Sequence, residues 1–481
     1  MLKDRFRISS LTWMIFGFAI VYAIISFLNH LCFRTYGLDL GLYTNAMYDY
    51  AHGSMANMDM IWDTKELALA DHFDLYLILF SPLVYVFGSW TLLIIQITAI
   101  FIGAKGVHTY FKDQARIALF ASFFFLSYFG IFSALSYDYH SNVIAAMAVP
   151  WLFYFVREKR FIASLLVLVF IWIGKENMAF WMVFVTLGLA LIYRKDRKSA
   201  LILLGFSFAS FCYFLLVLKV IMPLLSVEGD YLHFAYESLG ESMSEAFIHL
   251  LTHPIDSLEI FFSNHLPNPR FDGVKLESHI LLLISGVAIL IRKPAYLLML
   301  APIYFQKFFH DQPMTWSPGA QYSIEFAPIL AIGVFETVRS IKNEKFQKYA
   351  LIGTAVLSLA CTLRITDQPF DHVEESNVQF YKKRHFSRDY NTDAVWKAID
   401  LIPGDKAVCA QNPYLPHLAL RSDIFMFPYI KSAEYILISS KEYPYPLQTE
   451  ELFIEIEKLK VDSKWKIVFE EDGVYLFERV K

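Results

Sequence analysis

The feature that most constrains this chain is a series of long apolar segments, because a helix needs about 20 mostly apolar residues to cross a bilayer. About eleven candidate segments lie at residues 11–31, 91–111, 115–134, 141–156, 161–174, 178–193, 199–222, 278–291, 295–309, 321–338 and 347–365. Composition agrees, since only 18% of the residues are charged, against about 25% in a usual soluble domain. We therefore predict a polytopic α-helical membrane protein with about 11 transmembrane helices.

Charge and cysteine content exclude several other classes. The formal net charge of −4 argues against a nucleic-acid partner. The four cysteines show no metal-type spacing, and free cysteines in apolar segments behave as small hydrophobic residues. The basic start "MLKDRFRISS" precedes an apolar segment too long for a typical signal-peptide core. We expect an uncleaved first helix with a cytoplasmic N-terminus.

Lysine and arginine predict the orientation in the cell (inner) membrane. The run "LYLILFSPLVYVF" at 75–87 is short and contains Pro82, which favours an interfacial segment over a span. If this run does not cross, the predicted inner segments hold 18 Lys and Arg and the outer loops before the tail hold 6. Because basic residues concentrate in cytoplasmic loops, we place 75–87 on the outer face.

The same topology divides the chain into two domains. Residues 1–365 form the predicted transmembrane domain, with a first outer loop at 32–90 and a large outer loop at 223–277. From 366 to 481, short apolar runs alternate with turn residues, which predicts a small extracytoplasmic α/β domain. Its expected helices are 393–401, 412–419 and 449–460, and its expected strands are 406–410, 433–439, 465–470 and 473–479.

Carboxylates and histidines gather in the predicted outer loops, among aromatic residues. The candidates are Asp39, Asp71, His72, Asp138, His140, Lys175, Glu176, His310, Trp316 and Tyr322. Each has an ordinary alternative: Asp39 as a helix cap, Asp71–His72 and Asp138–His140 as exposed loop residues, and Lys175–Glu176 as a local ion pair at the interface. Together they predict a site at one membrane face, because ionisable groups near the bilayer are costly and usually functional.

Several motifs resemble a known family. "YGLDLGLYTNAMYDYAHG", "LADHFDLYLILFSPLVYVFGSWTLLIIQ", "SYDYHSNVIAAMAVPWLFYFV", "GKENMAFWMV" and "NPYLPHLALRSDIFMFP" resemble a family of prokaryotic predicted membrane proteins of unknown function. The match runs nearly end to end. That family in turn resembles the GT-C superfamily of membrane glycosyltransferases, mainly in architecture.

The resemblance to GT-C enzymes implies a specific reaction. Such an enzyme transfers a sugar, with inversion, from a polyprenyl-phosphate donor, and its catalytic acid lies early in the first outer loop, where this chain has Asp39. A carboxylate there would take the proton of the acceptor hydroxyl. Lys175 is the best partner for the leaving phosphate, with His72 or His140 assisting.

The remaining candidates complete the predicted site. Trp62, Trp316 and Tyr322 are placed to stack on sugar faces, and Asp71, Asp138, Glu176 and His310 to line the site. The expected partners are the lipid bilayer, the polyprenyl-phosphate-linked sugar and an acceptor glycan, lipid or protein. The second outer loop offers only "YDYH" where metal-dependent members have an acidic pair, so a divalent metal stays an open alternative.

Two other functions compete with sugar transfer. A secondary transporter would place ionisable residues near the membrane midplane in broken helices, within an internal repeat. Here they gather at one face, and no repeat is visible. A non-catalytic receptor or scaffold would bind its ligand through the outer α/β domain, and its demanding residues would lie in the tail rather than in the membrane-proximal loops.

Overall fold

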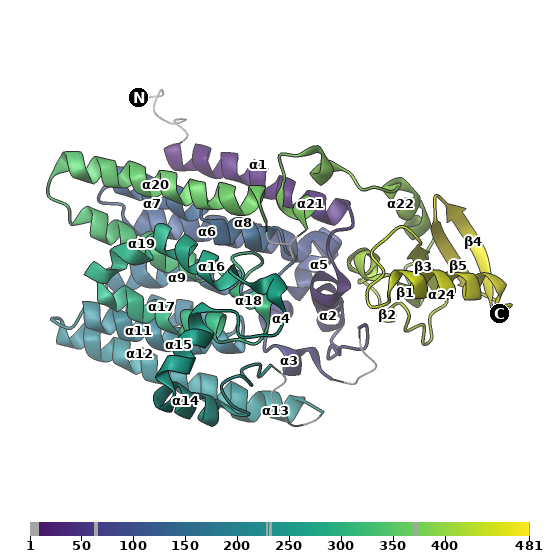
Figure 1. Cartoon of the computed structure of the whole chain (residues 1–481), viewed down its shortest axis with the longest axis horizontal. Coiled ribbons are helices and arrows are strands. Elements are labelled where there is room, and N and C mark those ends of the chain that lie inside the picture. Colours follow the sequence, from purple (N-terminus) through teal and green to yellow (C-terminus); the bar gives the residue numbers. More distant parts are fainter. Residues whose placement is uncertain (1–8, 62–65, 228, 230–232, 370–373, 481) are drawn as a thin grey trace. The chain divides into compact units, whose positions relative to one another are not determined.

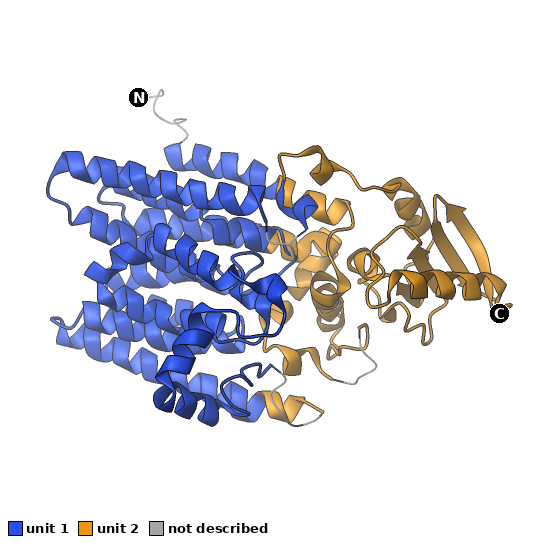
Figure 2. Cartoon of the chain, viewed as in Figure 1, with its two compact units in different colours: residues 1–23, 96–221, 231–379 blue, residues 24–95, 222–230, 380–481 orange. Residues whose placement is uncertain are grey.

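The computed structural model describes residues 9–61, 66–227, 229, 233–369 and 374–480, and it is mostly helical (Figure 1). The chain divides into two compact units (Figure 2). Unit 1 comprises Met1–Ala23, Gln96–Ile221 and Tyr231–Gln379, and unit 2 comprises Ile24–Ile95, Met222–Asp230 and Phe380–Lys481.

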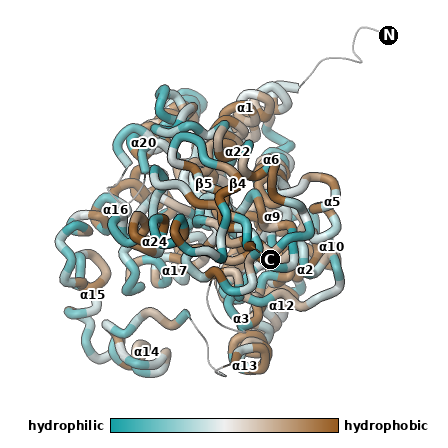
Figure 3. Tube along the Cα trace, turned by 90° about the vertical axis from the view of Figure 1, so that its right-hand side faces the viewer, coloured by the Kyte–Doolittle hydropathy of each residue, from teal (hydrophilic) through white to brown (hydrophobic). Residues whose placement is uncertain are grey.

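Every predicted apolar segment contains a helix. These helices are α1 (Ser10–Leu31), α6 (Thr91–Tyr110), α7 (Ala115–Leu126) with α8 (Phe129–Leu135), α9 (Ser141–Arg157), α10 (Phe161–Trp172), α11 (Glu176–Ile192), α12 (Arg197–Leu216), α16 (Val274–Ile284), α17 (Pro294–Phe308), α19 (Phe326–Arg339) and α20 (Glu344–Asp367). A π-turn, η4 (Val217–Ile221), continues α12 into α13 (Met222–Leu225), which carries the hydrophobic colour in Figure 3. The predicted helical architecture is confirmed at this level.

Four helical stretches among the described residues are long and apolar enough to cross a membrane. They are Ser10–Leu31, Tyr76–Tyr110, Arg197–Leu225 and Glu344–Asp367, and the bent pair α7–α8 would add a fifth. The other apolar helices are shorter, so the count of eleven crossings stays a prediction.

The two predicted outer loops are also helical in part. The first contains η1 (Gly37–Gly41), α2 (Leu42–Ala51), α3 (Ala68–Asp71), α4 (Tyr76–Phe80), η2 (Ser81–Leu83), α5 (Val84–Phe87) and η3 (Gly88–Trp90). The second contains α14 (Met243–Thr252), α15 (Pro254–Phe262) and η5 (Pro269–Phe271). Segment 75–87 is divided into short helical turns around Pro82, as expected where proline lacks the N–H donor that a continuous helix uses.

The tail forms a five-stranded sheet in the order β2-β1-β3-β5-β4. Its strands are β1 (Val408–Ala410), β2 (Ile424–Met426), β3 (Tyr435–Ser439), β4 (Trp465–Glu471) and β5 (Val474–Arg479). Strand β1 is parallel to both β2 and β3, with Val408 opposite Ile424 and Tyr435, whereas β5 is antiparallel to β3 and β4. The helical elements are η7 (Lys383–Phe386), α22 (Thr392–Asp400), η8 (Asn412–Tyr414), α23 (Leu415–Leu418) and α24 (Thr449–Val461).

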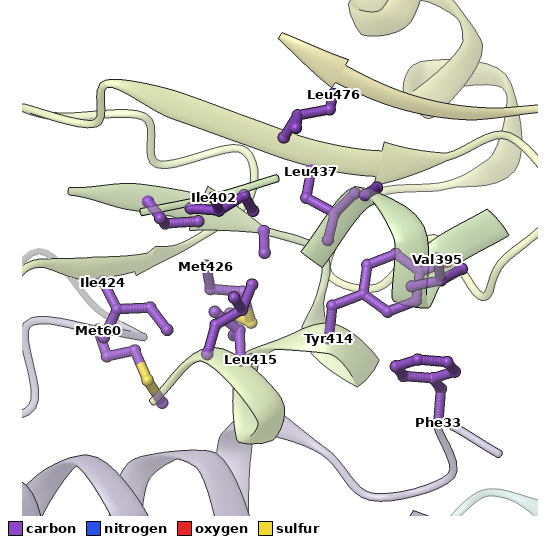
Figure 4. Packing of buried hydrophobic residues seen from close by; sticks show 14 of the residues in the cluster. Phe33, Met60, Val395, Ile402, Tyr414, Leu415, Ile424, Met426, Leu437 and Leu476 are labelled. Atoms are coloured by element: carbon purple, nitrogen blue, oxygen red, sulfur yellow. The ribbon is translucent and has the colours of Figure 1, made fainter. Parts of the chain in front are cut away.

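The first predicted outer loop shares a hydrophobic core with this sheet. Phe33 and Met60 from the loop belong to the same buried cluster as Tyr414, Leu415 and strand residues such as Leu476 (Figure 4). A backbone hydrogen bond from Met426 N–H to Met60 O, 2.7 Å long, joins the loop to the end of β2. The segment predicted as a soluble α/β domain therefore packs with residues of the first loop into unit 2.

Candidate functional site

The predicted site residues lie in both units. Unit 2 contains Asp39, Asp71 and His72, and unit 1 contains Asp138, His140, Lys175, Glu176, His310, Trp316 and Tyr322. Trp62, predicted to stack on a sugar, lies outside the described residues.

Asp39 lies at the centre of the π-turn η1, which leads directly into α2. The side chain is partly buried. Gly37 opens the turn, and its N–H donates a 2.7 Å hydrogen bond to Asn412 Oδ1. A Cβ at Gly37 would collide with Leu415 Cδ1 and lie 3.0 Å from Asn412 Oδ1, so this close approach of two segments requires glycine. Single π-turns are frequent at functional sites.

Asp71 and His72 follow one another at the end of α3, where the backbone becomes extended. Both side chains are partly buried. The nearby Asp74 is buried, and its Oδ1 accepts a 2.9 Å hydrogen bond from Tyr76 N–H. Asp74 thus stabilises the start of α4, while Asp71 and His72 remain candidates for chemistry.

Lys175 occupies the N-cap position of α11, and no side chain caps this helix end. Glu176 begins the helix and is buried. An acid in the first turn interacts favourably with the helix dipole, whereas a lysine there adds to its positive end. The N-terminus of α11 therefore combines a cation with the positive end of a helix that no side chain caps, an arrangement that attracts anions.

His310 lies within electrostatic reach of Lys175 in unit 1. Burial lowers the pKa of His310 to about 4; Asp311 acts in the opposite direction, and His233 and Lys175 lower it further. The imidazole is therefore neutral near pH 7, so that one ring nitrogen donates a hydrogen bond, the other accepts one, and the side chain adds no charge.

Glu325 is a buried carboxylate that the sequence analysis missed. Its Oε1 accepts a 2.7 Å hydrogen bond from Asn142 Nδ2, and the charges of Lys307 and Lys175 act on it. Lys307 is buried too, and its ammonium donates to Thr315 O and Ser317 O at 2.8 and 2.6 Å. Glu325 lies inside the segment predicted as span 321–338, and an acid within an apolar segment is itself a signal of function.

Asp138 and His140 are buried, which argues against the reading of an ordinary exposed loop. The Gln96 side-chain amide makes two hydrogen bonds to the backbone of this segment. Its Nε2 donates to Asp138 O and its Oε1 accepts from His140 N–H, each at 3.1 Å. The His140 ring stacks on Tyr137 with centroids 5.6 Å apart. Gln96 therefore orders the segment that carries both candidates.

Trp316 is fully buried at the end of α18 (Pro313–Trp316). Its Nε1–H donates to His310 O at 2.6 Å, and Lys275 Nζ lies 4.2 Å from the centroid of its ring system. The His265 ring lies 5.0 Å away. Stacking of a sugar on Trp316 stays a prediction, and it would require these contacts to open.

A chain of polar contacts runs from Asp311 to Lys275. Asp311 Oδ1 accepts from His265 Nε2 at 2.8 Å, and Lys275 Nζ donates to His265 Nδ1 at 2.9 Å. Because Nδ1 accepts, the proton of a neutral His265 must be on Nε2. Asp311 also accepts a 2.6 Å hydrogen bond from Ser238 Oγ. This series of hydrogen bonds anchors the large predicted outer loop to the segment that carries His310.

The model of a family described as "Predicted membrane protein (DUF2079)" matches residues 29–476. The chain belongs to this family. A search of the curated proteins finds no match.

Among solved structures, the chain is similar to the crystal structure of ArnT from Cupriavidus metallidurans bound to undecaprenyl phosphate. The TM-score is 0.52 at 12% identity, and the match covers 98% of this chain and 99% of that one. Both resemblances drawn from the sequence, to the family and to the GT-C fold, are confirmed. At this identity the likeness establishes the fold alone.

Proposed function

We propose that the chain is a GT-C-type membrane glycosyltransferase, which moves a sugar from a polyprenyl-phosphate donor to an acceptor at the outer membrane face. The observation that carries the proposal is the likeness to ArnT over 98% of this chain and 99% of that one, in a structure described as bound to undecaprenyl phosphate. The polar residues of the predicted outer loops supply the side chains that such a reaction needs.

The reaction is a displacement at the anomeric carbon. The acceptor oxygen forms a bond to this carbon, the bond to the phosphate oxygen breaks, and polyprenyl phosphate leaves with the electron pair. Inversion follows from a single displacement. Asp39, at the centre of the turn η1, is the proposed general base that takes the acceptor proton.

Lys175 is the proposed partner of the leaving phosphate. Its position at the uncapped N-terminus of α11 combines side-chain and backbone groups that stabilise negative charge as it develops. His72 or His140 is proposed to assist, and Asp71, Asp138, Glu176, His310 and Tyr322 to line the site. A divalent metal and the nature of the acceptor glycan, lipid or protein stay open in this proposal.

The pair Lys175 and Glu176 provides a direct test. Lys175→Met should weaken binding of an undecaprenyl-phosphate sugar, because it removes the phosphate partner, and Glu176→Gln should lower turnover by disturbing the orientation of Lys175. Lys348→Met is the matched control, since Lys348 is an exposed lysine on α20. Unchanged donor binding and turnover in both test variants would make the pair a local ion pair without a role in transfer.

A further inference from the structure

We propose that the C-terminal α/β domain holds the turn that carries Asp39 in its working position, with Asn412 as the positioning residue. The inference rests on the proposed role of Asp39 as general base. It assigns a role to a domain that supplies none of the proposed reacting groups, and every contact that supports it lies within unit 2.

The first anchor lies upstream of the turn, at Arg34. This residue is 2% exposed, and its guanidinium donates to three backbone carbonyls of the tail, those of Arg384 at 2.7 Å, His385 at 2.9 Å and Ser387 at 2.5 Å. Hydrogen bonds from a charged donor are roughly twice as strong as neutral ones. The backbone just before the turn is therefore attached to the tail through Arg34.

The second anchor is the turn itself. Gly37 N–H donates to Asn412 Oδ1 at 2.7 Å, and both residues are buried. Gly41, at the other end of the turn, also faces the tail, although less closely, since a Cβ there would lie 3.4 Å from Pro416 N and 3.5 Å from Leu415 Cβ. Both glycines of the turn thus face η8 and α23, which fixes the backbone on either side of Asp39.

The third anchor lies downstream, on α2. The amide of Asn45 donates to Ala419 O at 3.0 Å and to Arg421 O at 2.8 Å. Asp39 therefore lies between attachment points at residues 34, 37 and 45, and all three lead to tail residues 384–421. A domain that served only to bind a separate ligand would not need this set of contacts to one short segment.

The geometry has a catalytic consequence. A general base works only within hydrogen-bond reach of the proton that it takes, and a displacement of about 1 Å can cost on the order of 10²-fold in rate. Asn412 is suited to the task because it begins the tight turn η8 and is itself 3% exposed. Loss of its side-chain oxygen leaves the buried Gly37 N–H without this acceptor and frees the start of the turn.

The test compares three variants of the full chain in nanodiscs. Asn412→Ala removes the acceptor, and Asn412→Asp keeps an oxygen in its place. Gln411→Ala is the matched control, because Gln411 Oε1 accepts a buried 2.6 Å hydrogen bond from Ser439 N–H inside the tail and does not reach the turn. The readouts are hydrogen exchange of a peptide over 36–44 and transfer from a panel of undecaprenyl-phosphate-linked pentoses and hexoses.

Asn412→Ala should raise exchange at 36–44 and lower kcat about 10²-fold, with KM for the donor unchanged. Asn412→Asp should restore most of the rate, and Gln411→Ala should alter neither exchange at 36–44 nor kcat. Exchange that stays at the wild-type level in Asn412→Ala would overturn the inference, as would an unchanged kcat.

The variant Asp39→Asn distinguishes a failure of the proposed function from a failure of this inference. If Asp39→Asn turns over the donor as fast as the wild type while Asn412→Ala raises exchange, the proposed base is wrong. The tail would then be shown to dock the turn without positioning a catalytic residue.

Discussion

Lys275 should be one of the most costly residues of unit 1 to replace. It is 1% exposed, and its ammonium donates to Ile260 O, to Phe308 O at 2.7 Å and to His265 Nδ1 at 2.9 Å. The same charge lies over the ring of Trp316. All three ammonium protons thus have acceptors, which is the condition under which a buried lysine is tolerated.

Lys275→Met keeps the length and apolar stem of the side chain and removes every one of these contacts. Hydrogen bonds to charged groups contribute about 1.5–3 kcal/mol each, and a cation over an aromatic ring up to about 2 kcal/mol when desolvated. These contributions are not additive. Lys275→Met leaves three neutral buried acceptors without this donor, and each such loss costs about 1–3 kcal/mol. The desolvation that lowers the pKa of Lys275 to about 7 is relieved at the same time and offsets part of the loss, so we expect a net loss of about 3 kcal/mol for unit 1.

The assay is thermal unfolding of the full chain in nanodiscs, with hydrogen exchange of a peptide over 308–317. Since the entropy of unfolding is about 2.1 cal/mol/K per residue, a loss of about 3 kcal/mol in a unit of roughly 300 residues should lower Tm by about 5 °C. Lys275→Met should also raise exchange around Trp316. Lys348→Met controls for loss of a lysine. A Tm within 1–2 °C of that control, on the same approximate scale, would refute the reasoning that this network anchors the loop.

Three further predictions follow from other parts of the structure. Burial raises the pKa of Asp49 to about 6, while His52 opposes the shift and Asp423 adds to it. The folded protein therefore holds this proton more tightly than the unfolded chain does. The stability that the neutral acid contributes at low pH is lost as pH rises through about 6. Asp49→Asn should therefore raise the free energy of unfolding at pH 7.5 by about 1 kcal/mol after allowance for partial exposure, measured as a higher Tm, and leave Tm unchanged at pH 4. Equal Tm shifts at both pH values would refute the burial effect. Glu325→Leu should cost about 1–3 kcal/mol because it leaves Asn142 Nδ2 without its acceptor, while Glu325→Gln and the double variant Glu325→Leu/Asn142→Leu should recover most of that loss in the same unfolding assay. Reporter fusions after residues 113, 196 and 343 should report the cytoplasm and fusions after 60, 250 and 481 the outside, and a cytoplasmic signal at 481 would contradict the topology.

The helices were predictable because an apolar segment of membrane length has few structural alternatives. Each predicted segment holds a helix, and the tail elements were predicted to within a few residues. Strand β2 was missed, since "IFM" is only three residues long and forms a strand by pairing with β1. Short strands of this kind depend on tertiary pairing more than on local propensity.

The candidate site was predictable in residue type and less so in arrangement. Lys175, Asp39 and His310 stood out as ionisable groups next to apolar segments, but Glu325 was counted within a span. Trp316 was predicted to stack on a sugar face, whereas in the structure Lys275, 41 positions earlier in the chain, lies over its ring. The attachment of Gly37 to Asn412 joins residues 375 positions apart, and no local pattern encodes such a contact.

Sugar transfer itself is the most direct test of the proposed function. Membranes that contain the full chain and its natural acceptors would be given undecaprenyl-phosphate-linked sugars, and release of undecaprenyl phosphate would be measured for the wild type and for Asp39→Asn. The account predicts donor-dependent release by the wild type and a loss of about 10²–10⁴-fold in the variant, with donor binding and Tm nearly unchanged. Release that is equal in the two proteins, or a variant that loses stability together with activity, would contradict the assignment of Asp39 as the base of a sugar transfer.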